Sequence, residues 1–362
     1  MEIKNFIPIQ FIEDVLRSLR LKRVRMKAFF IKRIGKVEEV PLALLNVPVP
    51  EISEDEVLIK VLACGVCHTE LDEIEGRKIP KIPVVPGHEI IGRIIRMGRN
   101  VKKFRIGDRV GVAWINSACG KCKFCKEGLE NLCKEFKATG CDVNGGYAEF
   151  TKAKENFAYK IPDIFTDEEA APLLCAGAVG FRAIKLAEIK DGETVALFGF
   201  GGSNHIVFQV VRYLYPHSKI FVFTRRKNDE PYNLALKMKA DWVGETGETP
   251  PQKCNKAIDT TPKGEVVIEA LKILEKGGRV VINAIRKETK IPEINYDTLL
   301  WEEREIKSVA NVTSSDVEEF LNIAKEIPIK PEIVRFSFEE ANKALVMLKS
   351  GKIKGAAVLK IN

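Results

Sequence analysis

Two sets of metal-binding residue types occur in the sequence, and their spacings differ. Four cysteines fall within one short segment, at Cys119, Cys122, Cys125 and Cys133. Four thiolates from one loop can complete the tetrahedral coordination of a zinc ion and leave no position open to solvent. This set therefore predicts a structural zinc site.

The second set is spread along the chain. Cys67 lies in Cys-Gly-Val-Cys-His-Thr, His88 in Pro-Gly-His-Glu, and Cys175 in Pro-Leu-Leu-Cys-Ala-Gly. Two sulfurs and one imidazole nitrogen leave the fourth corner of a zinc tetrahedron for water or substrate, which is typical of a catalytic zinc. The remaining cysteines are predicted to be small buried hydrophobic residues: Cys64, Cys141 and Cys254.

These segments, taken in order, resemble the zinc-containing medium-chain alcohol dehydrogenases. The resemblance extends from about Met26 to the C-terminus and rests on the following words: Cys67-His68-Thr69, Gly87-His88-Glu89, Gly107 to Val110, the four-cysteine segment, Cys175 and Gly199 to Gly202. It implies a zinc-dependent oxidoreductase that transfers a hydride between an alcohol, expected to be a small primary alcohol, and NAD(P)+. A polyol or secondary-alcohol dehydrogenase on the same scaffold is the alternative. A second and more remote alternative is a non-catalytic zinc protein that binds a partner. The open metal position counts against this alternative, because a binding module has no use for it.

The resemblance also implies roles for single residues. Thr69 would receive or return the proton of the alcohol, and His68 would lie near the cofactor phosphates. Glu89 would be a carboxylate beneath the metal, or a direct ligand in some states. Trp114 would line the alcohol pocket, unless it is an ordinary core residue. Relatives usually carry Asp at the position of Glu70, where the carboxylate orients the zinc-bound histidine, so the longer side chain could alter zinc retention.

The proton path to solvent is expected to differ from that of many relatives. Asp72 stands where they carry a histidine, and an exposed aspartate is ionised at neutral pH and is a poor proton donor. The neighbouring Glu73 and Glu75 indicate a wet acidic surface. We therefore expect water to carry the proton.

A glycine-rich turn predicts the cofactor site. The apolar stretch Val195 to Phe198 precedes the turn, and apolar residues at helical spacing follow it, so backbone N–H groups can approach a pyrophosphate at a helix N-terminus. The predicted cofactor residues in the turn are Gly199, Gly201, Gly202, Ser203 and Asn204, of which Asn204 replaces the usual third glycine. The next strand ends in Thr224, Arg225 and Arg226 with no acid to bind a ribose 2′-OH, so NADP(H) is expected to be used at least as well as NAD(H).

The elements that must hold these residues fall into two expected domains, as the length of 362 residues suggests. Short β-rich segments punctuated by Pro and Gly predict a partly barrel-like, GroES-like catalytic domain over residues 26–176. Strands alternating with helices over 177–311 predict a Rossmann-type α/β domain with a doubly wound parallel sheet. Residues 312–362 are expected to return to the catalytic domain, with the active site in the cleft between the domains. Residues 1–25 form an extension with apolar residues at helical spacing between Phe11 and Leu19.

Composition excludes other classes of protein. The net charge is +8, but the 58 basic residues are dispersed among 50 acidic ones, so a nucleic-acid interface is not expected. No apolar run is long enough to suggest a membrane span. Cysteines at metal-ligand spacing without a secretory signal indicate the cytoplasm. The family resemblance implies two zinc ions per subunit and a homodimer or homotetramer.

Overall fold

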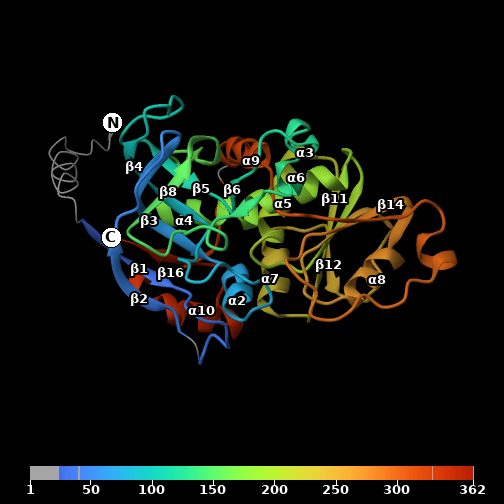
Figure 1. Ribbon diagram of the computed structural model, residues 1–362. Helices are drawn as coiled ribbons and strands as arrows, with labels where there is room; N and C mark the ends of the chain where they lie inside the picture. The colour runs from blue at the N-terminus through green and yellow to red at the C-terminus, as the bar shows by residue number, and fades with distance from the viewer. Residues whose placement is uncertain (1–23, 40, 328, 362) are drawn as a thin grey trace, which may run out of the picture. The chain divides into compact units, whose positions relative to one another are not determined.

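The computed structural model describes residues 24–39, 41–327 and 329–361 (Figure 1). The expected helical pattern between Phe11 and Leu19 lies outside these residues. The described chain divides into two compact units: unit 1 holds the residues up to Cys175 and those from Glu332 onward, and unit 2 runs from Ala176 to Pro331.

Unit 1 is built on mostly antiparallel β-structure, with one parallel pair between β16 and β17. Its main sheet has the strand order β16-β17-β3-β4-β5-β9, and β8 also pairs with β3. Smaller sheets form from β1 with β2 and from β6 with β7. The bounds are β1 Arg25–Phe30, β2 Ala43–Pro48, β3 Glu56–Val66, β4 Ile90–Met97, β5 Arg109–Val112, β6 Ile115–Ser117, β7 Lys137–Ala138, β8 Phe150–Lys154, β9 Tyr159–Lys160, β16 Ile333–Ser337 and β17 Ala356–Lys360. One apolar core runs through the unit, and β3 crosses it with Val57, Ile59 and Val61 fully buried.

The helices of unit 1 are short. They are α2 His68–Ile74, α3 Lys123–Lys126, η1 Glu130–Leu132, η2 Glu155–Phe157, α4 Asp167–Ala170, η3 Ala171–Leu174, η5 Phe338–Glu340 and α10 Ala341–Lys349. Helix α2 follows β3 directly, with Cys67 in extended conformation as its N-cap. The junction of β3 and α2 therefore carries the Cys67-His68-Thr69 segment.

Unit 2 is a six-stranded parallel sheet with helices. The strand order is β12-β11-β10-β13-β14-β15. From β10 the first strands are added toward one edge of the sheet and the later ones toward the other edge. Ligands of such sheets bind beyond the carboxyl ends of the strands, where this order switches between β10 and β13. The strands are β10 Thr194–Phe198, β11 Lys219–Thr224, β12 Trp242–Glu245, β13 Cys254–Asp259, β14 Leu274–Ile282 and β15 Glu305–Ser308. The helices are α5 Ala176–Ala187, α6 Asn204–Leu214, α7 Glu230–Lys237, α8 Glu265–Lys272, η4 Tyr296–Leu300 and α9 Ser314–Glu326.

The expected fold class is confirmed: a doubly wound parallel sheet accompanies a β-rich unit. One boundary differs from the expectation. Helix α9 was expected to belong to the catalytic domain, whereas it lies in unit 2 and the return begins at Glu332. Helix α9 packs on α5 of this unit, with a buried ion pair of 2.6 Å between Arg182 and Asp316 and a ring contact between Phe181 and Phe320.

One helical stretch, Asp167–Ala187, is long and apolar enough by length and composition to cross a membrane. The sequence had suggested no such stretch. It comprises α4, η3, Cys175 and α5, and 72% of its most apolar window is buried inside the protein. Core helices satisfy the same criterion, so the stretch carries no argument for a membrane.

Candidate active site and metal centres

The four clustered cysteines converge on one point. One sulfur from each of Cys119, Cys122, Cys125 and Cys133 lies within 4.8 Å of the others. The sulfurs of Cys122 and Cys125 are 3.6 Å apart, and those of Cys119 and Cys125 are 3.9 Å apart. This donor set suits a closed tetrahedral zinc site.

Backbone N–H groups prepare this lobe for thiolates. The N–H of Cys122 donates to the sulfur of Cys119 at 3.3 Å, and the N–H of Glu135 donates to the sulfur of Cys133 at 3.3 Å. Backbone donation from Lys121 and Cys122 lowers the pKa of Cys119 to about 6. Burial and the neighbouring thiols raise the pKa of Cys125 to about 12. Four thiolates so close together need a cation, because like charges oppose one another's ionisation.

The second metal set is assembled by strand pairing. Strands β3 and β4 are antiparallel, with Cys64 opposite Ile90, so the segment after β3 meets the segment before β4. This register brings Cys67 beside His88 and Glu89. Cys175 follows η3, and its sulfur lies 4.0 Å from that of Cys67. The ligand atoms of Cys67, His88, Glu89 and Cys175 lie within 4.8 Å of one another.

The environment of this set favours a cation. The pKa of Cys67 lies well below its usual range. The Cys175 thiol and the His88 ring lower this pKa, and together they outweigh burial, which would raise it. Burial raises the pKa of the Glu89 carboxyl well above its usual range. Nε2 of His88 is buried and has no hydrogen-bond partner among the described residues. Two sulfurs and a free imidazole nitrogen fit zinc, and Glu89 is near enough to be a further ligand.

Glu70 holds the geometry of the set. Its Oε1 lies 2.6 Å from Nδ1 of His88, and its Oε2 accepts a hydrogen bond from the backbone N–H of Cys67 at 2.7 Å. Both Glu70 and His88 are at most 1% exposed. The longer side chain therefore still reaches the histidine, because α2 places it one turn inside the helix. Contact at Nδ1 leaves Nε2 free for a metal.

The other residues expected at the reaction centre surround this set. Thr69 is 7% exposed, and its Oγ1 lies 3.6 Å from the sulfur of Cys67. His68 begins α2 and is exposed to solvent. Trp114 lies two residues beyond Val112, which pairs with Ile90. The pairing ends at Val112. The backbone oxygen of Trp114 accepts from the N–H of Thr139 at 2.8 Å, and the next residue, Gly140, packs closely against Gly87, which precedes His88.

The expectation of a wet acidic surface around Asp72 is wrong. Asp72 is 3% exposed and Glu73 is fully buried. Nε of Arg77 lies 2.5 Å from Asp72, and both Arg77 and Lys349 contact Glu75. The acidic run is covered by basic side chains, one of them from a distant segment.

The glycine-rich turn leaves room for a ligand. Gly199 has a φ of 77°, and a Cβ at Gly201 or Gly202 would meet no protein atom within 4 Å. Asn204 is fully buried, and its amide donates to the backbone oxygens of Phe198 at 3.0 Å and Gly199 at 2.8 Å. The residue that replaces the third glycine therefore ties the strand to the helix instead of loosening it. Ser203 donates to Ala176 O at 2.8 Å.

The end of β11 carries unpaired positive charge. Thr224 is buried, whereas Arg225 and Arg226 are exposed. Among the described residues, no ion pair or hydrogen bond engages either guanidinium group. The nearest carboxylates contact Lys227 instead: Glu245 accepts from its N–H at 2.7 Å, and Glu248 forms an ion pair with its ammonium group.

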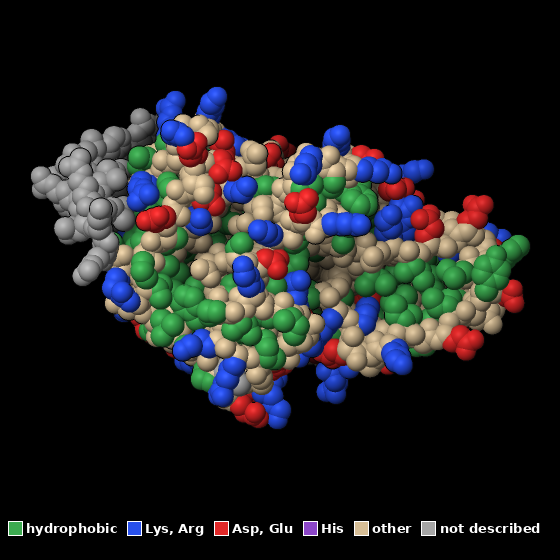
Figure 2. Space-filling model, in the orientation of Figure 1, with side chains coloured by type: hydrophobic (Ala, Val, Ile, Leu, Met, Phe, Trp, Pro, Cys, Tyr) green, Lys and Arg blue, Asp and Glu red, His purple; other side chains and the backbone are tan. Residues whose placement is uncertain are grey.

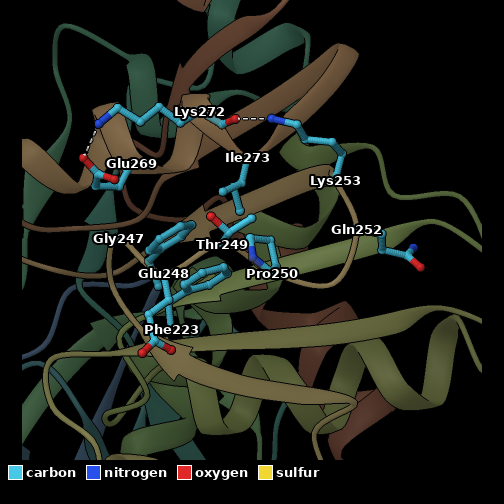
Figure 3. Close-up of a pocket in the computed structure, with 11 residues that line it drawn as sticks. Phe223, Gly247, Glu248, Thr249, Pro250, Gln252, Lys253, Glu269, Lys272 and Ile273 are labelled. Carbon is cyan, nitrogen blue, oxygen red and sulfur yellow. Dashed lines mark hydrogen bonds and ion pairs between the residues drawn. The ribbon is translucent and has the colours of Figure 1, made fainter.

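A cavity of about 310 Å³ lies beside this strand end in unit 2 (Figure 3). Phe198 and Phe223 line it, and their rings stack with centroids 4.4 Å apart. Glu248, Thr249 and Pro250 of the loop after β12 form another wall. Each phenylalanine immediately precedes a residue predicted to bind the cofactor, Gly199 or Thr224.

The role of Gly65 could not be predicted from residue spacing. A Cβ at this position would lie 1.8 Å from Oε2 of Glu89, and the N–H of Gly65 donates to the backbone oxygen of Glu89 at 3.0 Å. The missing side chain provides the space that the Glu89 carboxyl occupies. The glycine in Cys-Gly-Val-Cys was visible in the sequence, but only the strand pairing shows what it faces.

Gly65→Ala is therefore expected to displace Glu89 and weaken zinc binding at the Cys67 set by at least about tenfold, the usual scale for disturbing groups around a metal. Zinc retention against a chelator measures this effect. The four-cysteine lobe of the same molecule is the internal control and should keep its zinc. If the Gly65→Ala variant retained zinc at both sites as well as the unaltered protein does, the prediction would be contradicted.

Comparisons with known proteins agree with this geometry. The alcohol dehydrogenase GroES-like domain family matches residues 53–163. The probable alcohol dehydrogenase AdhA of Mycobacterium tuberculosis is 39% identical over 342 residues, covering 93% of this chain and 97% of its own. An alcohol dehydrogenase of Geobacillus stearothermophilus is 35% identical over 347 residues, covering 93% of this chain and 100% of its own.

Solved structures show the same fold. CAD from Helicobacter pylori, complexed with NADP(H), is 25% identical with a TM-score of 0.83, covering 94% of this chain and 99% of its own. Acetophenone reductase from Geotrichum candidum, in complex with NAD, is 26% identical with a TM-score of 0.82, covering 93% of this chain and 97% of its own. With the metal-binding groups described above, these similarities show that the chain belongs to the medium-chain zinc alcohol dehydrogenase family and is an NAD(P)-dependent enzyme.

Proposed function

We propose that this enzyme interconverts small primary alcohols and their aldehydes, using Cys67, His88 and Cys175 to hold the catalytic zinc. The observation that carries the proposal is the open ligand set with the Thr69 hydroxyl 3.6 Å from the sulfur of Cys67. A bound zinc would lower the pKa of an alcohol hydroxyl and polarise a carbonyl oxygen. Trp114, whose backbone contacts Thr139 beside the close packing of Gly140 on Gly87, supports a narrow pocket suited to unbranched substrates.

The chain's own residues then have separate tasks. Thr69 accepts the hydroxyl proton of the alcohol through its Oγ1 and returns it in the reverse direction. Glu70 keeps His88 in the orientation that leaves Nε2 for the metal. His68, exposed at the start of α2, is available to the cofactor phosphates. Glu89 lies within 4.8 Å of the other ligand atoms and would be available as a further ligand to a bound zinc.

Water remains the proposed carrier of the proton from this centre to solvent. Asp72 is held by the guanidinium group of Arg77 at 2.5 Å. An aspartate carboxylate already engaged in an ion pair is not free to pass a proton along a chain of groups. The burial of Asp72 therefore does not turn it into a relay.

Two cysteine variants test the assignment of the two zinc sites. Cys67→Ser should abolish turnover while one zinc per subunit and the fold remain. Cys122→Ser should instead lower Tm, by about 5 °C or more, because loss of a structural metal removes folding free energy. Atomic absorption, thermal unfolding and turnover of an alcohol decide between these outcomes.

Cys254→Ser is the matched control, because Cys254 is a buried cysteine of unit 2 outside both metal groups. It should keep both zinc ions and the turnover. Full activity in Cys67→Ser would remove the catalytic assignment.

We propose further that NADP(H) is used at least as well as NAD(H). Arg225 and Arg226 are exposed and lie where an acid would otherwise bind the ribose 2′-OH. Guanidinium groups suit the 2′-phosphate. The relatives of known structure bind NADP(H) in one case and NAD in the other.

Replacing Arg225 and Arg226 by alanine together should raise KM for NADPH by about tenfold or more, the scale of a lost charge-assisted hydrogen bond. KM for NADH should change much less. Lys219→Ala, at the opposite end of β11, is the control and should change neither constant. Equal increases for both cofactors would remove the argument.

We propose that the enzyme is a homodimer or homotetramer of the cytoplasm. The nine cysteines are unpaired, as in a reducing compartment. Among the described strands, β15 pairs only with β14, so its outer edge is open. Large apolar side chains between β14 and β15 are exposed: Ile285 58%, Ile291 40%, Tyr296 58% and Trp301 59%. Figure 2 shows hydrophobic side chains gathered on this part of unit 2. An open edge strand beside exposed aromatic residues favours pairing with a second copy.

The double substitution Tyr296→Lys and Trp301→Lys should therefore reduce the assembly to a single chain of 40.6 kDa. Two added charges would oppose burial of the exposed apolar surface between β14 and β15. Light scattering after size exclusion measures the mass. Ile164→Lys, an exposed apolar residue of unit 1, should leave the assembly intact. A monomeric parent protein would overturn the proposal.

A further inference from the structure

Lys78 places a positive charge beside the proposed alcohol pocket. Its Nζ lies 5.2 Å from the ring centroid of Trp114. Trp114 contacts Thr139 through its backbone oxygen, and Gly140, the residue after Thr139, packs against Gly87, which precedes His88. Cation–π attraction of this kind holds an ammonium group against the aromatic face instead of leaving it free in solvent.

The charge of Lys78 is not neutralised within the described part of the chain. No carboxylate there forms an ion pair with it, and its described interaction is with the Trp114 ring. Its neighbour Arg77 differs, because Asp72 and Glu75 both pair with that guanidinium group. The backbone N–H of Lys78 donates to Asp72 O at 3.0 Å, which fixes the segment to the end of α2. An ammonium group is thus positioned by both its backbone and its side chain, and its charge remains available.

The surroundings of Lys78 suit a chain with an anionic end. Trp114 and Phe136 form an aromatic surface with centroids 5.2 Å apart, which can cover methylene groups. The ammonium group lies over that surface. A carboxylate attached through a short aliphatic chain would meet apolar contacts first and the ammonium group at its end.

We propose that Lys78 selects ω-hydroxy acids and ω-oxo acids over neutral alcohols and aldehydes of the same length. This inference rests on the proposed function and names the substrate class of the same site. In the oxidation, the carbinol carbon gives a hydride to NAD(P)+, the hydroxyl proton leaves to solvent, and an ω-oxo acid and NAD(P)H form. The carboxylate is unchanged and only binds Lys78.

The test compares kcat/KM for ω-hydroxybutanoate with that for butanol in the zinc-loaded full-length enzyme. The hydroxy acid should be preferred, and Lys78→Met should lower the ratio by about tenfold, which corresponds to about 1.4 kcal/mol. Lys78→Glu should lower it further, and Lys78→Arg should largely retain it. Added salt should reduce the preference of the parent enzyme, because it screens an exposed charge, and should not affect the ratio in Lys78→Met.

Lys81→Met is the matched control, since Lys81 is an exposed lysine three residues further on without a described contact to Trp114. It should retain the preference of the parent enzyme. Zinc-dependent turnover of butanol with no preference for the hydroxy acid, or a ratio unchanged in Lys78→Met, would overturn this inference and leave the proposed function intact. Failure to turn over any alcohol or aldehyde would instead remove the proposed function.

Discussion

The buried carboxylate of Glu70 is the constraint on which the reaction centre depends. It accepts the N–H of Cys67 at the start of α2 and contacts Nδ1 of His88 before β4. One side chain therefore fixes two of the proposed metal ligands. Both oxygens of its carboxylate contact protein groups, and the side chain is buried from water. A buried charge is costly unless it is paired, so the fold must keep the β3–α2 junction and the start of β4 together. The strand register that does this also brings Gly65 against Glu89.

The two metal centres use different means to gather their ligands. The four-cysteine lobe obtains all its sulfurs from one segment and prepares them with local N–H groups. The residues of the Cys67 set come from three separate segments, and its two cysteines are 108 residues apart in the sequence. A local lobe can bind its metal and stabilise its own loop, whereas a centre assembled by strand pairing inherits its geometry from the whole unit. This difference agrees with a structural role for the first and a reactive role for the second.

The acidic segment after Thr69 shows why composition misled one expectation. Asp72, Glu73 and Glu75 look like a solvated face when read along the chain. In the structure Arg77 and Lys349 cover the outer carboxylates, and Glu73 turns inward, where burial raises its pKa well above the usual range. Lys349 is 274 residues from Glu75 in the sequence, so no local sequence pattern could predict this ion pair. The same holds for α9, which Asp316 binds to α5 in unit 2 through Arg182.

The sequence by itself determined the residue types and the local geometry. Cysteine spacing indicated a closed and an open metal set, and the strand, glycine turn and helix from Val195 onward predicted the cofactor turn, which lies between β10 and α6. The four-cysteine set and the cofactor turn depend on neighbours within a few residues, so their physics is local. The open set was inferred from residue types on separate segments. Tertiary structure alone decided that Glu70 still reaches His88, that Asn204 ties the turn to the strand, that Gly65 makes space for Glu89 and that Lys78 lies over Trp114. Each of these contacts depends on register between segments or on the direction of a buried side chain, which packing sets and sequence spacing does not.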